Sequence, residues 1–182
     1  MNTRRATTAV MVTQLWRWFS DARRFEEATN NATVAQENKL LSIIRAHRDT
    51  EYGRRYGFGS IRNIGDYQRN VPINSYENLA PYIERMTAGE QNILTAEAPL
   101  MFATTSGTTG KAKFIPVTNS SLSEVNHAVQ THTWRVLEDH PEAGAGQFMV
   151  TSSRDVEGRT SAGIPYGAMS GFVVKRQPSL VR

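Results

Sequence analysis

Apolar residues in the first part of the chain, from about Val10 to Arg55, recur at intervals close to the helical repeat. They form two stripes, one of Leu15, Trp18, Phe19 and Phe25 and one of Leu40, Leu41, Ile44 and the amphipathic His47. Thr33 and Gln36 have the spacing of a capping box, which predicts that the second helix begins there. This part of the chain is therefore predicted to be helical.

The next part, residues 53–97, is interrupted by residues that favour turns. Loops are predicted at its glycines, Gly53, Gly57, Gly59 and Gly65. Ser75 predicts a helix that begins at Tyr76, and Pro81 predicts that this helix ends or restarts, because proline lacks a donor and clashes inside a helix. The residues after Pro81 are predicted to form a helical piece that closes near Gly89.

From residue 98 onward the pattern changes to short apolar segments separated by polar loops. Strands are predicted at residues 99–105, 113–118 and 147–153. Between the second and third strands a helix is predicted, capped by Thr118, Asn119 or Ser120. The predicted fold class is α/β, with a helical N-terminal segment followed by strand, loop, strand, helix and strand.

The composition fits one folded domain. With 182 residues, 39% hydrophobic and 21% charged, the chain can bury a core and is not expected to be disordered. It has no cysteine, which excludes disulfides, cysteine-ligated metals and thiol catalysis. No apolar run approaches the roughly 20 residues of a membrane span, and the N-terminus does not resemble a secretory signal. We therefore expect a cytoplasmic protein.

Neither the charge nor the histidines indicate a nucleic-acid or metal site. The formal net charge is +4, but the arginines near the start alternate with acidic residues, as on a solvated helix face, and no nucleic-acid-binding motif accompanies them. His127 and His132 are five residues apart, which places them roughly 140° apart around a helix, whereas a helical zinc pair needs a spacing of four. We expect no metal ligands among the histidines.

The segment TTSGTTGKAKFIPVT, residues 104–118, combines the features that a phosphate site needs. Its glycines permit close approach of the backbone, its hydroxyl groups and turn N–H groups can donate hydrogen bonds, and its lysines supply charge. Gly107 and Gly110 give the backbone room, Ser106, Thr108 and Thr109 supply the hydroxyl groups, and Lys111 and Lys113 supply the charge. Only two residues separate Gly107 from Gly110, so the segment is not a Walker A loop. The alternative is a polar turn between two strands.

Residues 105–110, followed by Lys113, resemble the phosphate loop of the adenylate-forming superfamily, with Ala112 where a proline is common. The preceding YENLAPYIERMTAGEQNILTAEAPL and the later EGRTSAGIPYGAMSG narrow the resemblance. Together these segments resemble the auxin-responsive (Gretchen Hagen) family of acyl-acid amido synthetases, and bacterial relatives of that family are similar along nearly the whole chain.

The resemblance implies a two-step reaction that uses ATP with Mg²⁺. A carboxylic acid forms an acyl-adenylate and releases pyrophosphate, and an amine or amino acid then takes the acyl group and releases AMP. The loop donors of Ser106, Thr108 and Thr109 would hold the phosphates. The resemblance implies that Lys113 is the catalytic residue and offsets the charge of the leaving group, with Lys111 as a second candidate. It implies a phosphate-binding loop made of Thr105, Ser106, Gly107, Thr108, Thr109, Gly110 and Lys111.

Enzymes of this family are several hundred residues long. The resemblance therefore implies that residues 1–182 are an incomplete N-terminal portion of one adenylating domain, inactive alone. In this interpretation residues 1–97 are its mainly helical segment and residues 98–182 its phosphate-loop segment. The adenine, ribose and Mg²⁺ contacts would lie beyond residue 182.

Two other functions stay open at this point. An adenylating enzyme can pass its acyl group to coenzyme A instead of an amine, and the basic N-terminal helices with Trp16 and Trp18 could form a peripheral membrane or interaction module. Asp155 and Glu157 are candidate acid–base groups in a segment predicted to be an exposed loop. The glycines that follow them could approach a substrate or belong to a surface loop. The sequence does not specify an oligomeric state.

Overall fold

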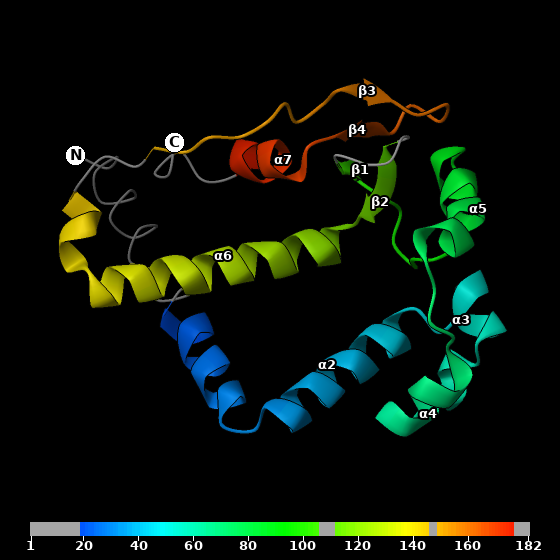
Figure 1. Ribbon diagram of the computed structural model, residues 1–182, viewed down its shortest axis with the longest axis horizontal. Coiled ribbons are helices and arrows are strands. Elements are labelled where there is room, and N and C mark those ends of the chain that lie inside the picture. The colour runs from blue at the N-terminus through cyan, green and yellow to red at the C-terminus, as the bar shows by residue number, and fades with distance from the viewer. Residues whose placement is uncertain (1–18, 106–111, 146–148, 177–182) are drawn as a thin grey trace, which may run out of the picture. The chain divides into compact units, whose positions relative to one another are not determined.

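The computed structural model describes residues 19–105, 112–145 and 149–176. The chain forms two compact units, one made of residues 1–35 and 123–149 and the other of residues 36–122 and 150–182. Two of the three boundaries between the units fall within helices, α2 (Ala32–Ala46) and α6 (Asn119–Asp139), which are labelled in Figure 1. The second unit contains the whole sheet.

The first unit is helical in its described part. Residues 19–29 form a helix, and the distal part of α6 is followed by a short 3-10 helix, η2 (Pro141–Ala145). The rings of Phe19 and Trp134 meet edge to face with centroids 5.6 Å apart. An ion pair joins Arg135 Nη1 to Glu26 Oε1 at 2.9 Å. The predicted helical character of this region is thus confirmed for the described residues.

The helix predicted from the second stripe is α2, but it begins earlier than the capping box predicted. Ala32 is its first residue, and the side chain of Asn31 accepts a hydrogen bond from the Val34 N–H at 3.4 Å. Thr33 therefore lies inside the helix, and the prediction of a Thr33–Gln36 capping box was wrong. Asn31 competes successfully because asparagine is at least as good an N-cap as threonine.

The prediction of loops at Gly53, Gly59 and Gly65 was wrong, because each of these residues lies in a short helix. These helices are α3 (Glu51–Arg55), the 3-10 helix η1 (Phe58–Ser60) and α4 (Ile64–Asn70). They follow α2, and the buried side chains of Leu41, Ile44 and Ile61 form a small core with them. Thr50 is buried and caps α3, since its hydroxyl oxygen accepts the Gly53 N–H at 2.9 Å.

Helix α5 (Tyr76–Thr87) begins where Ser75 predicted, with a capping box in which the Ser75 N–H donates to Asn78 Oδ1 at 3.0 Å. The predicted interruption at Pro81 was wrong, because the helix runs through that residue. Proline removes one backbone hydrogen bond, but Ile83 and Met86 on the same helix are buried in a hydrophobic cluster. Tertiary packing therefore offsets the local cost.

The C-terminal end of α5 agrees with the prediction. Gly89 has a φ of 98°, a left-handed conformation that favours glycine, and its N–H donates to Met86 O at 3.0 Å. The chain then leads toward the sheet.

The sheet has four strands in the order β2-β1-β4-β3 (Figure 1). Its strands are β1 (Met101–Thr105), β2 (Lys113–Val117), β3 (Gly158–Arg159) and β4 (Pro165–Gly167). Strand β1 pairs antiparallel with β2 and parallel with β4, and β3 pairs antiparallel with β4. The first two predicted strands are thereby confirmed, with β1 beginning at Met101.

The strand predicted at residues 147–153 was wrong where the structure describes it, because residues 149–153 pair with no strand. The residue after this segment, Arg154, instead lies beside the start of α7 (Met169–Arg176), where its carbonyl oxygen accepts the Ala168 N–H at 3.0 Å. The strands that follow α6 are β3 and β4, which lie later in the chain than the predicted one. The α/β fold class is confirmed.

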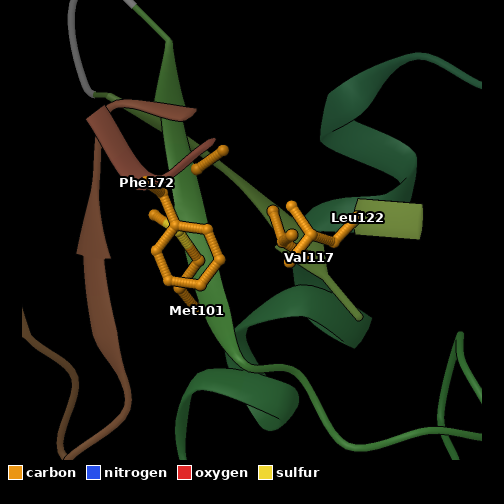
Figure 2. Packing of buried hydrophobic residues seen from close by; sticks show 5 residues of the cluster. Met101, Val117, Leu122 and Phe172 are labelled. Atoms are coloured by element: carbon orange, nitrogen blue, oxygen red, sulfur yellow. The ribbon is translucent and has the colours of Figure 1, made fainter. Parts of the chain in front are cut away.

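Within the second unit, one face of the sheet is covered by α7 and by the first turn of α6. Met101, Ala103 and Val117 of the strands pack with Leu122 at the start of α6 and Phe172 of α7. Figure 2 shows Met101 beside Phe172 and Val117 beside Leu122. This core fixes the β1–β2 hairpin between two helices.

Thr118 is the residue that caps α6, of the three considered. Its Oγ1 accepts the Ser121 N–H at 3.2 Å, while its own N–H donates to Ser121 Oγ at 2.8 Å. The carboxylate of Glu97 adds to this cap, because it accepts the Ser120 hydroxyl and, at 3.0 Å, the Ser120 N–H. These bonds, the hydroxyl first, lower the pKa of Glu97.

We expect this cap to make stability depend on pH. A lowered pKa in the folded chain means that the stabilisation is present above the unfolded value of about 4.3 and is lost as the pH falls through the folded value. Urea denaturation between about pH 6 and pH 3 should therefore show a steeper loss for the wild type than for Glu97→Gln, with the two curves converging in acid. Parallel curves would contradict the proposed role of Glu97.

None of the helices in the described ranges has the length and apolar character needed to cross a membrane.

Candidate functional site

The two ends of the predicted phosphate loop lie opposite each other at the end of the β1–β2 hairpin. Thr105 is the last residue of β1, Lys113 is the first of β2, and the two are paired in the antiparallel ladder. The structure therefore brings these two predicted site residues together. The other predicted site residues lie outside the described ranges; they are Ser106, Gly107, Thr108, Thr109, Gly110 and Lys111.

The side chain of Lys113 lies against the beginning of α5. Its Nζ is 3.7 Å from Glu77 Oε1 and 5.1 Å from the centroid of the Tyr76 ring. The lysine side chain keeps 41% of its surface exposed. A partly exposed ammonium group thus lies where the loop joins β2.

A hydrogen bond and an aromatic cluster anchor the base of the hairpin. The Tyr76 hydroxyl accepts the Phe114 N–H at 2.9 Å. The Phe114 ring meets those of Phe102 and Tyr166 edge to face, with centroid distances of 6.0 and 5.2 Å. Such aromatic pairs hold strands in register, so the base of the loop is fixed by α5, β1 and β4.

Of the two candidate acid–base groups, Glu157 contacts the described part of the hairpin. The hydroxyl of Thr104 donates to Glu157 Oε2 at 3.3 Å. Asp155 is paired instead with Lys175, whose Nζ lies 2.8 Å from Asp155 Oδ2. This hydrogen bond to Lys175 lowers the pKa of Asp155, which favours its ionised form and disfavours a role as a proton donor.

Gly167 and Gly171 allow close contact with the backbone of residues 153–155. A Cβ atom on Gly167 would lie 2.4 Å from Asp155 O, and one on Gly171 would lie 2.2 Å from Ser153 O. Both contacts are with backbone atoms, which cannot move aside easily. Close packing therefore accounts for these two glycines without a substrate.

Tyr76 and Glu77 were missed as site residues by reasoning from the sequence, whereas Glu157 was among the candidate acid–base groups. Tyr76 and Phe114 are 38 positions apart, and no periodic pattern links them. The cap at Ser75 was a usable signal for the start of α5, but not for its proximity to the hairpin.

A separate polar cavity of about 420 Å³ lies beside α3 and α5. Its lining residues are Glu51, Arg55, Tyr56, Asn74, Asn78, Pro81, Tyr82 and Arg85. The guanidinium of Arg85 is already bonded to the carboxylates of Glu51 and Glu90, at 2.8 and 2.7 Å. Because the cavity includes neither Thr105 nor Lys113, the hairpin remains the candidate site.

Metal ligands are not gathered at one place in the described part of the chain. No group of three or more histidine, cysteine, aspartate or glutamate side chains there could hold a metal ion. The described carboxylates therefore form no ready-made Mg²⁺ site by themselves.

Comparison with known proteins identifies the family. Residues 21–182 match the family described as the GH3 family N-terminal domain. The probable indole-3-acetic acid-amido synthetase GH3.1 of Arabidopsis thaliana is 36% identical over 102 residues, which are 55% of this chain and 17% of the relative. The 4-substituted benzoates-glutamate ligase GH3.12 of the same plant is 29% identical over 148 residues, or 79% of this chain and 25% of the relative.

Solved structures show the same fold. The acyl acid amido synthetase GH3.15 in complex with 2,4-DB is similar with a TM-score of 0.78 and 23% identity, over 87% of this chain and 28% of that chain. This chain thus spans about a sixth to a quarter of the length of the curated relatives above.

Proposed function

Because this chain belongs to the GH3 family, we propose that its β1–β2 hairpin binds the phosphates of ATP during adenylation of a carboxylic acid. The observation that carries the proposal is the pairing of Thr105 with Lys113, which sets a lysine at the mouth of a loop rich in glycine and hydroxyl groups. A turn with no ligand would need neither the charge nor the hydroxyl groups. The polar-turn alternative therefore explains less.

In the first step, a carboxylate oxygen attacks the α-phosphorus of ATP. A bond forms between these atoms, the bond from the α-phosphorus to the bridging oxygen breaks, and pyrophosphate leaves. The hydroxyl groups of Ser106, Thr108 and Thr109, with backbone N–H groups of residues 105–111, would hold the phosphates. The ammonium of Lys113 would offset the negative charge that grows on the leaving group.

In the second step, an amine nitrogen attacks the acyl carbon of the adenylate. The carbon–nitrogen bond forms, the bond to the AMP oxygen breaks, and the amine loses a proton. The relatives named above include a probable indole-3-acetic acid-amido synthetase and a 4-substituted benzoates-glutamate ligase. Their names favour an amino acid over coenzyme A as the acceptor. Mg²⁺ would accompany ATP, with ligands outside the residues that the structure describes.

Location in the cytoplasm and the division at residue 97 stay predictions. The peripheral membrane or interaction module also stays untested, since Trp16 and Trp18 lie outside the described residues.

Removal of the Lys113 charge tests the proposal. We expect Lys113→Ala to weaken pyrophosphate binding about tenfold, the effect of one lost charge-assisted hydrogen bond. Titration of the chain with pyrophosphate, followed by ³¹P NMR, measures this. Lys39→Ala, which removes an exposed lysine of α2, serves as the matched control and should bind like the wild type. The proposal fails if the wild type shows no saturable binding.

A further inference from the structure

Tyr76 and Glu77, the first two residues of α5, both contact the side chain of Lys113. The Ser75–Asn78 capping box fixes the backbone at this end of the helix. Two consecutive side chains therefore reach one lysine from a rigid element. We call this pair the lysine seat.

We propose that the lysine seat holds Lys113 at the mouth of the hairpin and that Glu77 competes with bound phosphate for its ammonium group. Tyr76 and Glu77 are then positioning residues, which act on the ligand through Lys113. The inference rests on the proposed phosphate-binding function of the hairpin. It adds which side chains position Lys113 at that site.

Tyr76 contributes two contacts of different kinds. Its hydroxyl accepts the N–H of Phe114, the residue after Lys113, which fixes the backbone next to the lysine. Its ring centroid is 5.1 Å from Lys113 Nζ, within the range of a cation–π interaction. The same side chain thus positions the strand and the ammonium group.

Glu77 provides the competing negative charge. Its own backbone N–H, then the Ser75 hydroxyl and the charge of Lys113, lower the pKa of its carboxyl group. The carboxylate is therefore ionised at neutral pH, beside the positive end of the α5 dipole. At 3.7 Å it attracts Lys113 without a close hydrogen bond.

The ion pair between Lys113 and Glu77 is weak. The Lys113 side chain is 41% exposed and that of Glu77 is 73% exposed, so water screens their attraction. Exposed ion pairs are weak, which corresponds to a factor of about two to five in an equilibrium constant. A multiply charged phosphate could therefore draw the ammonium group away at little cost.

A double-mutant cycle tests the competition. Pyrophosphate affinity is measured by ³¹P NMR for Glu77→Gln, made in the wild type and in Lys113→Ala. We expect binding about two- to fivefold tighter in the wild-type background and unchanged in the Lys113→Ala background. Glu84→Gln removes an exposed carboxylate from the same helix and should leave the affinity nearly unchanged in both. An equal gain in both backgrounds, or no gain in either, would overturn the proposal.

A second measurement tests the seat without any phosphate. The ring of Tyr76 should shift the NMR signals of the Lys113 side-chain methylene groups upfield, and this shift should persist in Tyr76→Phe and disappear in Tyr76→Leu. If the wild type shows no such shift, the seat is wrong. If the shift is present but pyrophosphate does not bind, the phosphate-binding function and the competition fail while the resting contact stands.

Discussion

Replacement of Phe102 by alanine should cost about 3 to 5 kcal/mol of unfolding free energy, the usual cost of removing a buried aromatic ring. Phe102 lies in the middle of β1 and is fully buried. It packs with Ile83 and Met86 of α5 and meets the ring of Phe114. Its loss would leave a cavity directly beneath the hairpin.

Urea denaturation followed by circular dichroism measures this effect. Ile73→Ala provides the matched control, because Ile73 is fully exposed and its truncation should change the unfolding free energy by less than about 0.5 kcal/mol. Equal effects of the two substitutions would mean that Phe102 is not part of the core.

Gly167→Ala is the second substitution with a large expected effect. The added Cβ would lie 2.4 Å from the carbonyl oxygen of Asp155, so the backbone of one of the two segments must shift. We expect a loss of about 1 to 3 kcal/mol, typical of overpacking. Because Gly167 pairs with Ala103 of β1, the shift should also disturb the strand that leads into the loop.

Gly59→Ala is the control for this substitution, since a Cβ at Gly59 would meet no atom within 4 Å. It should change the unfolding free energy by less than about 0.5 kcal/mol. A Gly167→Ala variant as stable as Gly59→Ala would show that the segment near Asp155 relaxes freely.

The elements that the sequence predicted correctly have local signals. The strands of the hairpin are short apolar runs bounded by a polar loop, and the start of α5 carries a serine cap. One error was local, because Asn31 rather than Thr33 caps α2. The others arose where tertiary contacts decide. Pro81 is tolerated because α5 buries Ile83 and Met86. Residues 149–153 pair with no strand, and the Ser153 N–H donates instead to Ser170 Oγ of α7.

The candidate site was predictable only in part, for the same reason. The loop and Lys113 follow from a contiguous motif, in which spacing and residue type are visible in the sequence. Tyr76 and Glu77 reach Lys113 across more than 30 positions of sequence, through a contact that only the packing of α5 beside β2 creates. The motif therefore indicates Lys113 as the candidate group, whereas the fold determines that Tyr76 and Glu77 contact it.

The parallel pairing of β1 with β4 has a consequence for the order of events during synthesis. The hairpin partner β2 follows β1 after a short loop, but Tyr166, the partner of Phe102, is made roughly 60 residues later, after the whole of α6. Until then one edge of β1 has no strand beside it, and open edges invite pairing with other chains. A ribosome that pauses between α6 and β4 would therefore prolong a state in which this edge is open to other chains.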